Sequence, residues 1–89
     1  MINRNHKTRN KAITDKLLRI ESSLLGGGEH LPINWCTDYI SWAAKFNKIS
    51  SYETDYFATL ALYALGHLTV EEEAELMDAV ATRKWRLTK

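Results

Sequence analysis

The histidines and the cysteine are the residues of this 89-residue chain best suited to metal or nucleophilic chemistry. A zinc site or a catalytic cysteine needs several such groups held together at a fixed spacing. His6, His30 and His67 fall instead in a predicted N-terminal arm and in two predicted loops, and only His30 lies near Cys36 in the sequence. We therefore predict a protein that is not an enzyme and that holds no metal and no cofactor.

A glutamate cluster and a glycine run have structural explanations that compete with any chemical role. The glutamates of residues 71–75 follow Thr69, and Thr69 with Glu72 has the spacing of a helix capping box. The helix dipole favours acids in a first turn, so the cluster indicates a helix start. Residues 26–28 are all glycine, but they lack the Lys of a phosphate loop and precede Glu29, whose charge opposes an anion. They predict a connector between helices.

Positive charge gathers at the two ends of the chain. Residues 1–19 contain six Lys or Arg residues and one acidic residue, and residues 83–89 contain four Lys or Arg residues and no acidic residue. Residues 20–82 between them contain two Lys residues and ten acidic residues. Lys and Arg separated by short polar spacers suit contacts with phosphates. As an alternative to protein binding, the sequence predicts nucleic-acid contacts by Arg4, Lys7, Arg9, Lys11, Lys16, Arg83, Lys84 and Arg86.

Four aromatic residues form a line along one predicted helix. Trp35, Tyr39, Trp42 and Phe46 recur at helical steps of four, three and four, which places their rings on one face. The adjoining face is apolar as well, so we expect this helix to be the most buried one. The aromatic line is then either core or an interface, where Trp and Tyr are favoured anchors. These four residues are the predicted protein-interaction site.

Helical periodicity and helix-end signals divide the chain into four helices, at about residues 11–25, 33–46, 51–65 and 70–84. The pairs Ser50 with Glu53 and Thr69 with Glu72 are predicted capping boxes, and Gly66 is predicted to end the third helix. The last helix is expected to face inward through Val70, Ala74, Met77, Val80 and Ala81. No alternating pattern of strands is present, so the predicted fold is a small all-α, four-helix domain.

Length and composition agree with one domain, predicted as residues 11–89 behind a mobile basic arm of residues 1–10. So short a chain buries little apolar area, which favours self-association, and we expect a homodimer. The sequence has no apolar run that could cross a bilayer, so no membrane partner is predicted. A lone cysteine, which has no partner for an intramolecular disulfide, indicates the reducing cytoplasm.

Residues 18–25, with the sequence LRIESSLL, follow an Arg9 and Asn10 pair and resemble the opening helix of the lambda-type phage CII activators. The resemblance covers a short part of the chain, and the glycine run then departs from that pattern. No DNA-contacting residue is carried over from it, and it is not counted as membership of that family.

Together these features predict a small regulatory or adaptor protein, of the kind that mobile elements encode, which binds a larger protein or complex. The alternative is a dimeric nucleic-acid-binding transcriptional regulator that uses the basic arm and the C-terminal tail. The sequence identifies neither the partner nor the direction of regulation.

Overall fold

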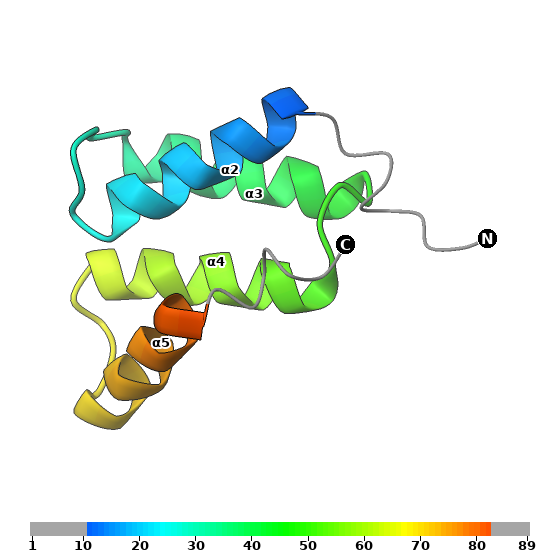
Figure 1. Ribbon diagram of the computed structural model, residues 1–89. Helices are drawn as coiled ribbons and strands as arrows, with labels where there is room; N and C mark the ends of the chain where they lie inside the picture. Colours follow the sequence, from blue (N-terminus) through cyan, green and yellow to red (C-terminus); the bar gives the residue numbers. More distant parts are fainter. Residues whose placement is uncertain (1–10, 83–89) are drawn as a thin grey trace.

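The computed structural model describes residues 11–82, which form four α-helices (Figure 1). Their bounds are Lys11–Leu24 for α2, Ile33–Lys45 for α3, Ser51–Ala64 for α4 and Val70–Thr82 for α5. This confirms the predicted all-α, four-helix fold. The predicted basic arm of residues 1–10 and the tail of residues 83–89 lie outside the described residues.

The helix ends follow from local sequence chemistry. Gly26 and Gly66 lie two residues beyond the ends of α2 and α4 and adopt positive φ angles of 85° and 77°, a conformation that favours glycine. At the start of α4 the Ser50 side chain accepts from the Glu53 N–H, while the Ser50 N–H donates to the Glu53 carboxylate at 2.6 Å. Thr69 and Glu72 make the same reciprocal pair before α5, so both predicted capping boxes are confirmed.

Helix α4 is the centre of the bundle, because α2, α3 and α5 all pack against it (Figure 1). Its Phe57 and Leu60 are almost completely buried, and α2 contributes the predicted apolar stripe with Leu17 and Ile20 fully buried. The expectation that residues 33–46 form the most buried helix was wrong. Helix α3 fully buries only Cys36, Ile40 and Ala43, because it packs through a narrow face of small and medium side chains and turns its widest apolar face outward.

Helix α5 packs on the core through a face that includes only Val80 of the residues predicted to point inward. Leu76 is its single fully buried residue, and Ala79 and Val80 are half-buried. The predicted inward residues Val70, Ala74, Met77 and Ala81 are exposed. Helix α5 contacts α4 at one side of the bundle, so one large leucine fixes its orientation more strongly than several alanines and valines on another face.

Two carboxyl groups are buried in the apolar interior, one bonded between two helices and one bonded at the start of a helix. Glu21 of α2 is 3% exposed and accepts a hydrogen bond of 2.5 Å from the Tyr56 hydroxyl of α4. Glu53 is fully buried and belongs to the capping box of α4. Buried polar groups require such partners, and the bond between Glu21 and Tyr56 fixes how α2 sits on α4.

Candidate protein-binding face on helix α3

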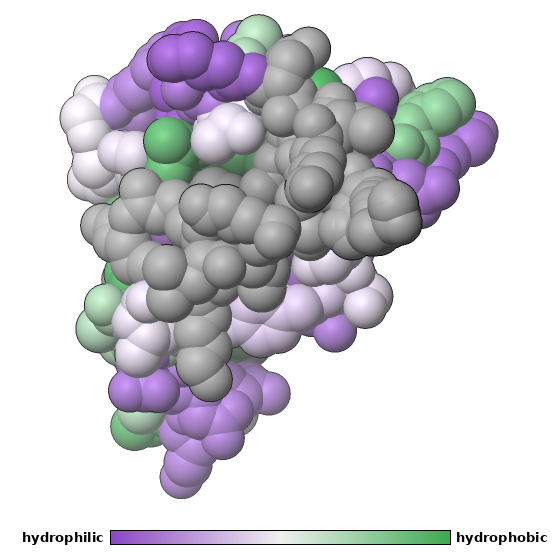
Figure 2. Space-filling view, turned by 45° about the vertical axis from the view of Figure 1, so that its right-hand side comes forward, coloured by the Kyte–Doolittle hydropathy of each residue, from purple (hydrophilic) through white to green (hydrophobic). Residues whose placement is uncertain are grey.

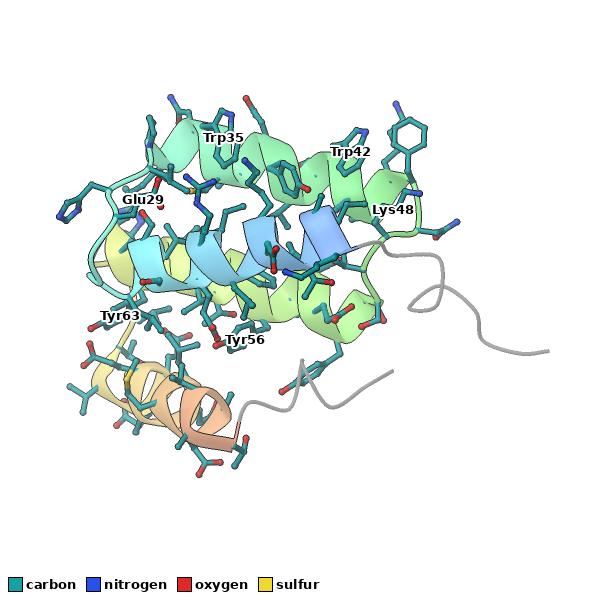
Figure 3. The ribbon with its side chains drawn as sticks, turned by 45° about the horizontal axis from the view of Figure 1, so that its top comes forward. Glu29, Trp35, Trp42, Lys48, Tyr56 and Tyr63 are labelled. Carbon is teal, nitrogen blue, oxygen red and sulfur yellow. The ribbon has the colours of Figure 1, made fainter. Side chains whose placement is uncertain are left out.

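The predicted aromatic line lies on the outer surface of α3 and is here called the aromatic ridge, comprising Trp35, Tyr39, Trp42 and Phe46. Trp35, Trp42 and Phe46 keep 39%, 41% and 55% of their surface exposed, and Tyr39 is half-buried against the core. Figure 3 shows both tryptophans on the side of α3 that faces away from the other helices. The interpretation of these rings as core is therefore wrong, and they form a continuous exposed apolar surface.

The rings of the ridge contact one another in sequence along the helix. The Trp35 and Tyr39 ring centroids are 5.5 Å apart in a stacked arrangement, and the Tyr39 and Trp42 centroids are 5.3 Å apart. The Trp42 and Phe46 centroids follow at 6.1 Å. Aromatic pairs at these separations stabilise each other, so the ridge is a preordered surface whose side chains lose little freedom on binding.

A lysine lies at each end of the aromatic ridge. The Lys16 ammonium of α2 is 5.2 Å from the centroid of the Trp35 ring, and the Lys45 ammonium is 5.8 Å from that of Phe46. Both are cation–π contacts, and neither lysine forms an ion pair within residues 11–82. Asp38 is the one carboxylate of α3 and lies beside the ridge. The border of the ridge is thus more basic than acidic.

The connector after α2 is held against the first helix by an ion pair. Two Arg19 side-chain nitrogens, Nε and Nη2, donate to the Glu29 carboxylate, with the Nε bond at 2.9 Å. The neighbouring guanidinium lowers the pKa of Glu29. The Ser23 hydroxyl also accepts from the Leu31 N–H at 2.8 Å. These bonds place the start of α3 next to α2, which is how Lys16 reaches Trp35.

A second candidate surface is a groove of about 350 Å³ between α4 and α5, here called the acidic groove. Its lining residues are Tyr52, Asp55, Tyr56, Thr59, Leu62, Leu68, Glu72, Glu75, Leu76 and Ala79. Residues 49–82 contain seven acids and no Lys or Arg. This groove was not predicted from the sequence, although the long stretch without a basic residue was a signal that could have indicated an acidic surface.

Another hollow, of about 340 Å³, lies between α3 and α4 and is lined mainly by small and apolar side chains. Cys36 is its one ionisable residue, and burial raises the pKa of that thiol. A buried thiol with a raised pKa is a poor nucleophile. Within residues 11–82 no cluster of three metal-binding side chains occurs, and none of the described helices is long and apolar enough to cross a membrane.

Only two of the predicted nucleic-acid residues lie in the described part of the chain. Lys11 pairs with Asp15 at 2.8 Å, and this hydrogen bond raises the pKa of the lysine. Lys16 is the one that the structure brings to the aromatic ridge. The others, which are Arg4, Lys7, Arg9, Arg83, Lys84 and Arg86, lie outside the described residues.

Comparison with known proteins adds no family to this description. No family model matches the chain. Comparisons with curated proteins and with solved structures find no significant match either. The resemblance to the phage CII activators is therefore confined to the few residues that carry it.

Proposed function

We propose that this protein is a small regulatory or adaptor protein that binds another protein through the aromatic ridge. The observation that carries the proposal is the outward position of Trp35, Trp42 and Phe46, each more than a third exposed. Large exposed apolar surfaces on small domains are usually binding sites, and Trp and Tyr supply much of the affinity in such sites. The proposal includes the predicted cytoplasmic location and a homodimer.

The size of the expected effect follows from the exposed ring area. At about 40% exposure a tryptophan side chain presents roughly 100 Å² that a partner can cover. At about 25 cal/mol per Å² this corresponds to about 2.5 kcal/mol for each ring. Replacing one tryptophan by a polar residue should then weaken binding by between about tenfold and a hundredfold.

The test is quantitative affinity capture from cells of the natural host, with and without nuclease. The wild-type chain is compared with Trp35→Gln/Trp42→Gln and with the control Leu65→Ala/Val70→Ala, which removes exposed apolar groups at the end of α4 and the start of α5, outside the ridge. We expect the ridge variant alone to lose its nuclease-resistant partner. If the ridge variant and the control capture the same proteins as the wild type, the proposal fails.

Nucleic-acid binding is the second candidate, and one observation favours it. Lys16 lies over the Trp35 ring, which combines a cation with an exposed aromatic face, and stacking on aromatic rings beside positive charge is a common way to hold single strands. In the proposed dimer the basic ends would add phosphate contacts. This model predicts an affinity that falls steeply with salt, and a smaller salt dependence after deletion of residues 1–11.

A further inference from the structure

The described part of the chain has two apolar surfaces with borders of opposite charge. The aromatic ridge lies between Lys16 and Lys45. The acidic groove has Tyr52 and Leu62 exposed at 42% and 43% along a wall of carboxylates. Figure 2 shows a hydrophilic patch at the lower tip of the molecule, where Figure 1 places the start of α5, and further hydrophilic patches at the top and at the right edge.

Charge decides which pairs of these surfaces can meet. If the ridges of two copies packed in antiparallel orientation, Lys16 would lie opposite Lys45 of the second copy. Two acidic grooves in contact would bring Asp55, Glu72 and Glu75 against their own counterparts. Like charges across an interface are unfavourable, whereas a ridge placed in a groove sets lysines against carboxylates.

We propose that the acidic groove of one copy receives the aromatic ridge of a second copy. The inference rests on the proposed role of the ridge as a protein-binding face, and it names a partner for that face. The proposed homodimer is then the smallest assembly of this kind. Because the two contacting surfaces differ, the contact is heterologous and leaves a free ridge and a free groove at the ends, to which further copies can add. Self-association then competes with any other protein for the ridge, so dilution or salt frees it.

Sedimentation velocity of the full chain in low salt tests the proposal. We expect the wild type to form species heavier than the 10.2 kDa monomer and to return to that mass as salt rises. Two variants each remove one surface: Trp35→Gln/Trp42→Gln disables the ridge, and Asp55→Lys/Glu75→Lys disables the groove while leaving both capping boxes intact. Each variant alone should be monomeric.

Mixing the two variants gives the sharpest result. The groove variant keeps its ridge and the ridge variant keeps its groove, so an equimolar mixture should form one heterodimer of about twice the monomer mass and nothing larger. The matched control is Glu71→Lys/Asp78→Lys, which changes net charge equally but alters no groove-lining residue. That control should self-associate like the wild type.

Several outcomes would overturn the inference. A wild type that stays monomeric at low salt and millimolar concentration would do so, as would a mixture of the two variants that stays monomeric. Self-association that persists in Asp55→Lys/Glu75→Lys would indicate ridge-to-ridge packing. Persistence in Trp35→Gln/Trp42→Gln would indicate that another basic segment occupies the groove. If the ridge variant does not fold by circular dichroism, Lys16→Glu/Lys45→Glu replaces it as the single-variant test.

Failure of this inference and failure of the proposed function are distinguishable. If the wild type is monomeric and the ridge variant still loses the cellular partner, only the proposed contact between copies is contradicted. A self-associating protein whose captured proteins do not depend on the ridge contradicts the cellular adaptor role alone.

Discussion

The hydrogen bond between Glu21 and Tyr56 offers a direct test of how α2 is attached to the bundle. It joins a carboxyl group that is 3% exposed to a hydroxyl from a side chain that is 5% exposed, at 2.5 Å. Tyr56→Phe removes the hydroxyl and keeps the ring, whose edge packs against Phe57 with centroids 5.3 Å apart. The bond matters for the ridge as well, since α2 carries Lys16 to Trp35.

Loss of a buried hydrogen bond of this kind costs about 1 to 3 kcal/mol. For a domain of this size each kcal/mol lowers the Tm by about 4 to 8 °C, so a loss of about 2 kcal/mol corresponds to about 8 to 16 °C. Glu21→Met should destabilise the protein by a similar amount. The double variant should lose less than the sum of the two single losses, because the same bond is broken only once.

Urea unfolding followed by circular dichroism at neutral pH measures all four proteins of this cycle. Tyr63→Phe is the matched control, because Tyr63 is half-buried and its hydroxyl makes no hydrogen bond within residues 11–82. We expect it to change the free energy of unfolding by less than about 0.5 kcal/mol. Additive losses in the cycle, within about 0.5 kcal/mol, would refute a coupled Glu21 and Tyr56 pair.

Three further predictions concern single positions. In urea titrations, Leu76→Ala should lower the free energy of unfolding by about 2 to 4 kcal/mol and Met77→Ala by less than about 1 kcal/mol. The reason is that Leu76 anchors α5 while Met77 is exposed. Equal losses would contradict this orientation of the helix. In thermal unfolding, Ser50→Ala should lower the free energy of unfolding by about 1 kcal/mol because it removes the capping box, whereas Ser51→Ala should leave it almost unchanged. Burial raises the pKa of the Cys36 thiol, so the unfolded chain loses this proton first and stability should fall as pH rises through about 9. The stability of Cys36→Ala should lack this part of the decline. If the stability of the wild type and of Cys36→Ala falls equally at alkaline pH, the prediction is wrong.

Local sequence signals determined the fold class and the ends of the helices. The stripe of Ile13, Leu17, Ile20 and Leu24 is buried as expected, and the capping pairs lie where the spacing of Ser, Thr and Glu predicted them. These signals could be used without a structure because each depends on residues a few positions apart, whose interaction is set by helix geometry alone.

Only the tertiary structure decided which apolar face of each helix is covered. Helix α3 has two adjoining apolar faces, and periodicity cannot tell which one meets α4; the smaller Cys36, Ile40 and Ala43 fit there, and the larger aromatic rings remain outside. The same ambiguity gave the wrong face for α5. The contact of Lys16 with Trp35, and the groove that Asp55 and Glu75 both line, arise from the packing of distant segments. A pattern within one helix carries no information about them, because it does not fix the neighbours of that helix.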